Sequence, residues 1–247
     1  MKKHCSVLTL MIRSSFWPVL LVLAGMAALE TGSFLFVLHR GPVEELFHLE
    51  WVVQHSGLQW IFAAAVIAVT LLLCRVGCNG SSFPAYTLNR LSVSDVAVYF
   101  WQAAANLLYF LLLWSVQLLL AFGFGRLYEL LADPQFVTGQ TVFLSFYRSP
   151  FFHTLLPFGD WLLWLNNLVM VLGFSLCAAR YPMAQRRGRK FGEIFLVLLV
   201  FLMTMNHEIH DVPRCTFALI TCIILSIFSL VKVFGLTEDP REVAEDA

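Results

Sequence analysis

Long apolar runs separated by short polar segments dominate the chain, and the runs are 16 to 30 residues long. They cover residues 16–38, 57–74, 96–125, 161–179, 191–206 and 215–234. A membrane-spanning α-helix needs about 20 mostly apolar residues. The pattern therefore predicts an all-α polytopic membrane protein with six transmembrane helices. These form one transmembrane domain over residues 1–236, followed by a polar tail at 237–247.

Composition supports this class. The 247 residues are 59% hydrophobic and only 13% charged, whereas a soluble domain has about 25% charged residues. A chain with so little charge cannot cover the surface of a water-soluble globule. This excludes a cytosolic enzyme, a secreted disulfide scaffold, a disordered chain and a nucleic-acid-binding protein.

The net charge is zero, but the positions of the charges are informative. If the N-terminus is cytoplasmic, twelve of the sixteen Lys and Arg residues fall in cytoplasmic segments, led by the cluster at Arg180–Lys190. Positive charge concentrates on the cytoplasmic side of membrane proteins. We therefore expect a multi-pass protein of the cell membrane with both termini in the cytoplasm. Within this cluster, Arg186, Arg187, Arg189 and Lys190 could bind anionic membrane lipids, although topology alone explains their presence.

Two outer segments contain more apolar residues than ordinary loops do. Pro42–Gln54 alternates glutamates with large apolar residues, so it predicts a short helix that lies in the outer interface or packs over the end of the bundle. The segment Arg126–Asp160 is rich in Phe and is interrupted by three prolines. So large an aromatic surface is rarely left in water. We expect this segment, Phe136–Gly159 above all, to dip into the membrane or to pack across the outer mouth.

The inner segment between the second and third spans, Arg75–Asp95, predicts a short cytoplasmic helix. Ser82 can cap a helix that Pro84 helps to start. Ser92 and Asp95 then have the Ser-x-x-acid spacing that begins the next helix. The result would be a small, partly apolar projection that a cytoplasmic protein could bind.

The residues of this projection resemble a known motif. The run Tyr86-Thr87-Leu88-Asn89-Arg90-Leu91-Ser92-Val93-Ser94 follows the second of six spans. It is similar to the coupling helix in permease subunits of ATP-binding cassette transporters of the type-2 exporter class, where the pattern is T-L-x-x-L-P-V-S. Ser92 stands where that family more often has Pro, so the turn would depend on serine capping here.

The resemblance implies a non-catalytic membrane subunit that moves a substrate across the membrane. The sequence contains no G-x-x-x-x-G-K-[ST] phosphate-binding loop, so a separate cassette ATPase subunit would hydrolyse ATP. The ATPase would bind Thr87, Leu88, Asn89, Arg90, Leu91 and Ser92. The resemblance also implies pairing with a second permease chain, as a homodimer or a heterodimer.

Several polar residues lie within the predicted spans and could line a substrate path. They are Glu30, Asn106, Gln117 and Asn166, the last followed by Asn167. Ionisable groups inside a membrane usually face the bundle interior or a cavity, although Glu30 could also extend toward the outer interface. For the amides, interhelical hydrogen bonds are the plainer explanation.

The remaining chemical signals are weaker. His207 and His210 are three residues apart, whereas the zinc protease motif places its histidines four apart, so we expect a polar cap near Arg214 rather than a metal site. Cys74 and Cys78 lack a second pair, which speaks against zinc and against a disulfide framework. We expect no catalytic residues, metal or cofactor. The alternative function is a membrane-embedded enzyme or accessory factor acting on lipid or isoprenoid substrates. A haem or quinone protein ranks last because the histidines lie mostly at the outer interface.

Overall fold

The computed structural model describes residues 2–41, 48–76, 78, 94–131, 140–186, 192–205 and 211–235, and it contains helices and no strands within these ranges. Five described helices are long and apolar enough to cross a membrane: α1 (Lys2–Arg40), α3 (Leu58–Arg75), α5 (Asp95–Leu131), α8 (Trp161–Arg186) and α10 (Val212–Phe234). A shorter apolar helix, α9 (Glu193–Met205), accompanies them. Three more are short: α2 (Leu49–His55), α6 (Thr141–Arg148) and α7 (Pro150–Leu155).

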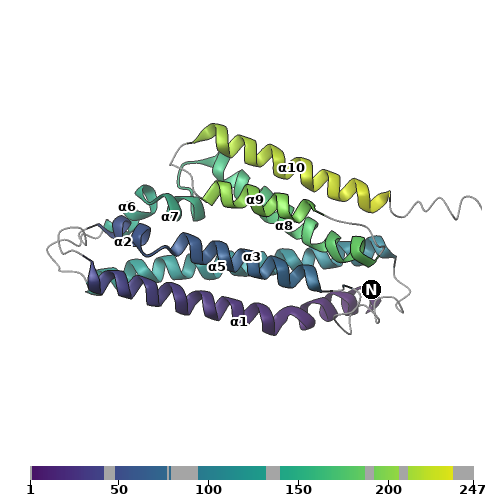
Figure 1. Cartoon of the computed structure of the whole chain (residues 1–247), viewed down its shortest axis with the longest axis horizontal. Coiled ribbons are helices and arrows are strands. Elements are labelled where there is room, and N and C mark those ends of the chain that lie inside the picture. Colours follow the sequence, from purple (N-terminus) through teal and green to yellow (C-terminus); the bar gives the residue numbers. More distant parts are fainter. Residues whose placement is uncertain are drawn as a thin grey trace, which may run out of the picture.

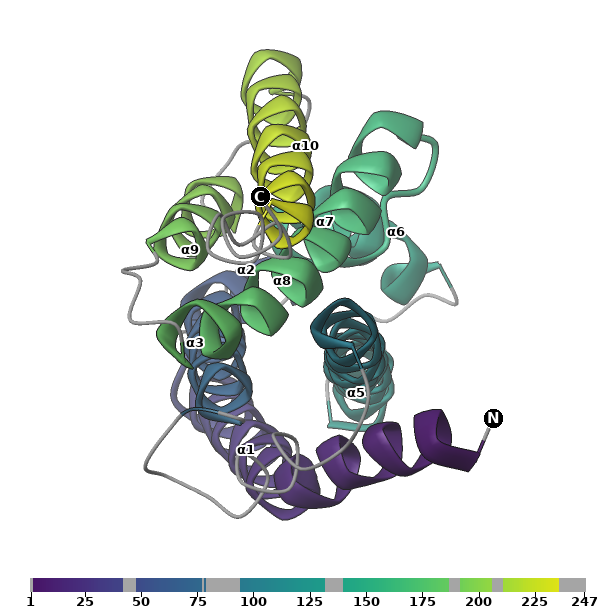
Figure 2. The ribbon, with the colours of Figure 1, turned by 90° about the vertical axis from the view of Figure 1, so that its right-hand side faces the viewer.

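The long helices form an elongated bundle in which the chain direction alternates (Figure 1). α1 begins and α10 ends at one end of this bundle, which we call the terminal end. The opposite end carries α2, α6 and α7, and we call it the capped end. Viewed from the terminal end, α8 lies centrally, and it packs against α3, α5, α9 and α10 (Figure 2). α1 packs against α3 and α5 on the far side of the bundle from α10.

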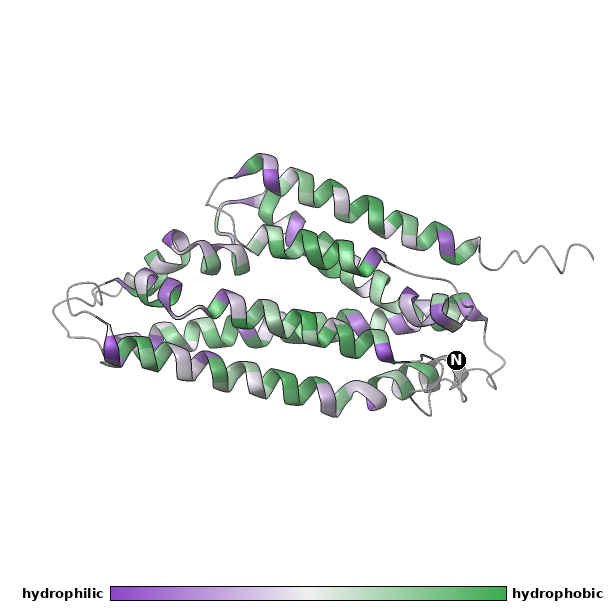
Figure 3. Cartoon of the chain, in the orientation of Figure 1, coloured by the Kyte–Doolittle hydropathy of each residue, from purple (hydrophilic) through white to green (hydrophobic). Residues whose placement is uncertain are grey.

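The outer surface of the bundle is apolar along most of its length, and polar residues gather toward its two ends (Figure 3). Large apolar side chains point outward from the middle of the long helices, such as Leu21 (72% exposed), Leu119 (71%) and Ile224 (59%). Such a surface suits hydrocarbon rather than water. The described helices therefore have the architecture of a polytopic helical membrane protein.

Several helices run beyond the apolar stretches that predicted them. α1 begins at Lys2 rather than near residue 16, and its first turns bend across the terminal end beneath α5 (Figure 2). Pro18 lies inside α1 and has no N–H for the carbonyl of Ser14, which accounts for a bend. Val7 and Met11 in these first turns pack against Val98 and Ala105 of α5.

The other long helices differ from the predicted spans chiefly at one end. α5 continues to Leu131 and α8 to Arg186, past the predicted ends at 125 and 179. α3 and α10 start within three residues of their predicted starts. α9 covers 193–205 of the predicted run at 191–206, whose first and last positions lie outside the described residues. Hydropathy marks only the apolar part of a helix, and backbone hydrogen bonding continues into polar flanks. The tail at 237–247 lies outside the described residues.

The capped end is built from the apolar outer segments. α2 buries Leu49, Val52 and Val53 and packs against α1, α3 and α6, so this part of the outer segment packs over the bundle. In α6 and α7, Phe146 and Phe152 are fully buried, and their rings stack 4.8 Å apart. The described part of the aromatic segment, which excludes residues 132–139, therefore packs across the capped end of the bundle.

Close packing at the capped end explains Gly125 of α5. A Cβ at this position would lie 2.8 Å from Cγ1 of Val142 in α6, which is too near for any side chain. Glycine therefore lets α6 approach the end of α5.

Candidate functional site

The most unusual buried group is Glu30 of α1. It lies on a buried stripe with Leu23, Met26 and Phe34, and this stripe packs against α5. Glu30 and Gln117 of α5 are both 0% exposed, and Nε2 of Gln117 donates a 2.9 Å hydrogen bond to Oε2 of Glu30. Glu30 therefore pairs inside the bundle, and the alternative in which it extends to the outer interface is wrong.

The Glu30–Gln117 contact leaves two acceptors without partners. Oε1 of Glu30 and Oε1 of Gln117 are both buried and form no hydrogen bond. Toward the capped end the contact is closed by Phe34 and Phe124, whose rings stack 4.8 Å apart. The hydrogen bond and the stacked rings together join α1 to α5.

The other two predicted path residues do not join this pair. Asn106 of α5 faces α8, where its Nδ2 donates a 3.3 Å hydrogen bond to the carbonyl of Ser175. Asn166 of α8 is 2% exposed, and its Oδ1 has no partner. The next residue, Asn167, donates to the carbonyl of Thr154 in α7 at 2.7 Å. Asn106 and Asn167 therefore form interhelical hydrogen bonds, which was the alternative to lining a substrate path.

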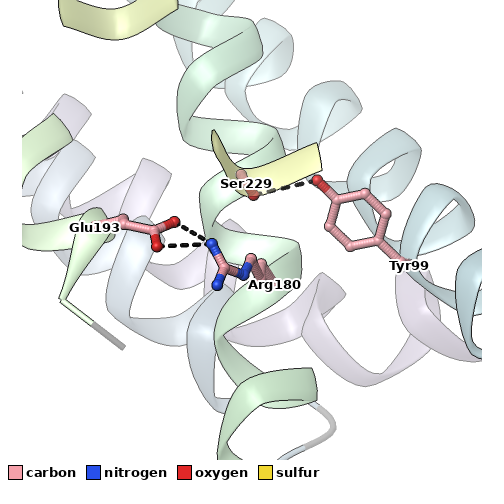
Figure 4. Close-up of polar contacts among 4 residues, drawn as sticks. All are labelled: Tyr99, Arg180, Glu193 and Ser229. Atoms are coloured by element: carbon pink, nitrogen blue, oxygen red, sulfur yellow. Dashed lines mark hydrogen bonds and ion pairs between the residues drawn. The ribbon is translucent and has the colours of Figure 1, made fainter. Parts of the chain in front are cut away.

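A second buried polar group, which we call the Arg180 cluster, lies near the terminal end and consists of Tyr99, Arg180, Glu193 and Ser229 (Figure 4). Arg180 of α8 donates from Nη1 to Oε1 of Glu193 in α9 at 2.7 Å. The two side chains are only 9% and 13% exposed. Tyr99 of α5 and Ser229 of α10 share a 3.4 Å hydrogen bond beside this ion pair. The cluster therefore connects four helices.

Sequence reasoning missed the Arg180 cluster. Arg180 was counted among the basic residues of a cytoplasmic segment, but it is 7% exposed and lies six residues before α8 ends. Its guanidinium also lies 5.6 Å from the ring centroid of Phe228, within the range of a cation–π contact. One signal was available: Arg180 and Glu193 carry opposite charges at the facing ends of two successive spans.

A largely apolar, partly open pocket, which we call the cavity, lies between α3, α5, α8 and α9, beside α7. Its walls include the aromatic residues Phe62, Phe110, Trp114, Phe174 and Phe201. Polar lining is confined to Thr154, Asn167 and Thr204. Among the described residues that line this space none is ionisable, so the cavity could hold an apolar group but offers no acid or base.

The predicted coupling residues Thr87 to Ser92 lie outside the described residues, but both ends of their segment are described. α3 ends at Arg75 and α5 begins at Asp95, both at the terminal end (Figure 1). Gln102 of α5 donates a 3.1 Å hydrogen bond to the carbonyl of Val76. Ser94 caps α5, since its Oγ accepts from the backbone N–H of Ala97. These contacts fix the two ends of the segment close to α5.

Metal ligands do not gather in the part of the chain that the structure describes, where no group of three or more His, Cys, Asp or Glu residues could hold an ion. His207 and His210 lie outside the described residues. Near them, Oδ1 of Asp211 caps α10 by accepting from the backbone N–H of Arg214, and the two side chains form an exposed ion pair at 3.3 Å. Arg214 therefore belongs to a small polar cap at the capped end.

Comparisons with known proteins identify no relative. No family model, curated protein or solved structure matches this chain.

Proposed function

We propose that the chain is the permease subunit of an ATP-binding cassette transporter of the type-2 exporter class. In this proposal a separate ATPase subunit drives the movement of a substrate across the cell membrane. The chain itself performs no catalysis and pairs with a second permease, identical or different. The main support is the similarity of residues 86–94 to the coupling motif, together with their place between α3 and α5.

The bundle is compatible with six spans in this proposal. The five long helices and α9 run in alternating directions, so the start of α1, the end of α3, the start of α5 and the end of α10 share the terminal end. α9 has 13 described helical residues, which rise about 20 Å at 1.5 Å per residue. The predicted span at 191–206 extends past this helix at both ends. Lys2, Lys3 and Arg13 then add to the positive charge of a cytoplasmic terminal end.

Residues near the projection would transmit movement of the ATPase into the bundle. α5 continues directly from the coupling segment, and Gln102 fixes it to the end of α3. The Arg180 cluster lies one or two helical turns farther into the bundle than the start of α5. Its hydrogen bonds join α5 to α10 and α8 to α9. A shift of the segment at 79–93 would thus reach most of the long helices through packed contacts.

A photo-crosslinking amino acid at position 88 tests this proposal in intact membranes. Because Leu88 would lie in a groove of the ATPase, we expect an adduct with a protein that carries a phosphate-binding loop. The matched control places the same group at Gln140, which is exposed at the capped end, and should give no such adduct. An ATPase adduct from position 140, or none from position 88 in membranes that contain the ATPase, would contradict the proposal.

The cavity supports a second candidate, an enzyme or accessory factor acting on lipid or isoprenoid substrates. A space lined mainly by aliphatic and aromatic side chains suits a hydrocarbon chain. Its lack of ionisable lining favours binding over catalysis. Recovery of the chain with a tightly held isoprenoid and without any ATPase would favour this second function.

A further inference from the structure

The Glu30–Gln117 contact has an imbalance of donors and acceptors. The side-chain amide of Gln117 gives one of its N–H groups to Oε2 of Glu30, and the two Oε1 atoms remain buried without a donor. Buried polar atoms almost always have a hydrogen-bond partner. Two unpartnered acceptors on two residues that already contact each other therefore indicate that a donor belongs between them.

An ionised Glu30 cannot supply that donor. A carboxylate only accepts hydrogen bonds, so both Oε1 atoms would stay unsatisfied. The charge would also lack a counter-ion, since within the described residues the ion pairs involve other side chains. A charge within a membrane-spanning helix is costly unless it is paired.

A carboxylic acid resolves the imbalance with one added atom. Its O–H on Oε1 donates to Oε1 of Gln117, while Nε2 of Gln117 donates to Oε2. All four polar atoms then take part in a closed ring of two hydrogen bonds. We propose that Glu30 carries a proton and that Glu30 and Gln117 together form a buried proton-binding site between α1 and α5.

The described helices that pack against α1 offer Glu30 no ion-pair partner. α1 packs against α2, α3 and α5. Their described ionisable side chains are Glu50, His55, Cys74, Arg75, Asp95, Tyr99, Tyr109, Arg126, Tyr128 and Glu129. In the described structure none of these forms a hydrogen bond or ion pair with Glu30. Among the described residues, Gln117 is the hydrogen-bond partner of the Glu30 carboxyl group.

The site makes the contact between α1 and α5 depend on the proton. Loss of the proton would place a carboxylate beside an amide oxygen, two acceptors that repel each other. The helices would then have to separate or admit water. This property goes beyond the proposed function, because a transporter driven by an ATPase does not require a proton site.

Infrared spectroscopy of the full chain in lipid vesicles at neutral pH tests the inference. A protonated carboxyl group has a C=O stretch above the amide band, and exposed carboxylates are ionised at this pH. We expect this band in the wild-type protein and its loss in Glu30→Gln, which can still form the same ring with Gln117. The exposed-pair variant Glu129→Gln is the control and should keep the band. Absence of the band from the wild type, or its survival in Glu30→Gln, would overturn the inference.

Two further measurements extend the test beyond the loss of the band in Glu30→Gln. Gln117→Leu removes the hydrogen bond to Oε2, so the same band should move to higher frequency. Raising the pH should lower the melting temperature of the wild type more than that of Glu30→Gln, because the proton stabilises only the wild type. A melting temperature that instead rises with sodium concentration, in the wild type alone, would show a bound cation and exclude the proton.

Discussion

Replacing Arg180 with Met should destabilise the protein by about 3–5 kcal/mol, the usual cost of removing one partner from a buried ion pair. The carboxylate of Glu193 would remain in the bundle, 13% exposed and without the guanidinium that now lies against both its oxygens. The variant should therefore unfold at a clearly lower temperature in detergent. Thermal unfolding followed by circular dichroism measures this change.

A double substitution separates the ion pair from the packing. Because desolvation offsets much of the attraction in a buried pair, Arg180→Met combined with Glu193→Met should recover at least half of the lost stability. The matched control is Arg126→Met, which breaks an exposed pair with Glu129 in the same chain and should cost less than about 1 kcal/mol. A loss for Arg180→Met no larger than that control, or no recovery in the double variant, would show that the Arg180 cluster does not hold the helices together.

Changes in the coupling segment should weaken ATPase binding without affecting the bundle. Arg90→Glu reverses a charge, and Leu91→Asp places a charge on the apolar face of the projection. Each should cost about 2 kcal/mol or more, which is roughly 30-fold in affinity, if these residues are central to the interface. Titration of the purified ATPase onto the reconstituted chain measures the dissociation constant.

The control for these changes is Arg126→Gln, which removes a basic side chain that is 81% exposed near the capped end. It should leave ATPase affinity unchanged. The melting temperatures of Arg90→Glu and Leu91→Asp should also match the wild type. Equal ATPase affinity for Arg90→Glu, Leu91→Asp and Arg126→Gln would remove the coupling role from the segment.

Much of the bundle could be predicted from hydropathy. Each of the predicted spans contains or overlaps a described helix, because apolar runs near 20 residues long have few stable structures other than helices in a membrane. The ends could not be predicted in the same way. α1 starts at Lys2, and α8 continues past Arg180, since a helix needs backbone hydrogen bonds and not apolar side chains.

The buried polar contacts were harder to predict than the spans. Glu30 could be placed in the first span, but its partner is 87 residues away in sequence, and composition gives no sign of such a pairing. The burial of Arg180 was not predicted, because a basic residue at the end of an apolar run normally marks the cytoplasmic interface. Here the facing charge of Glu193 draws it into the bundle.

The assignment to a transporter still depends on the motif at 86–94, and the six spans and the cytoplasmic termini remain predictions. The described structure shows where the chain on each side of residues 79–93 is held. Val76, which precedes the motif, and Ser94, its last residue, are both held by hydrogen bonds at the start of α5.

The most direct test of the transporter proposal is co-purification of the wild-type chain from native membranes in mild detergent. We expect a cassette ATPase with a phosphate-binding loop to be recovered with it, together with a second permease chain. Recovery of a stable, monomeric chain with no ATPase would contradict the proposal.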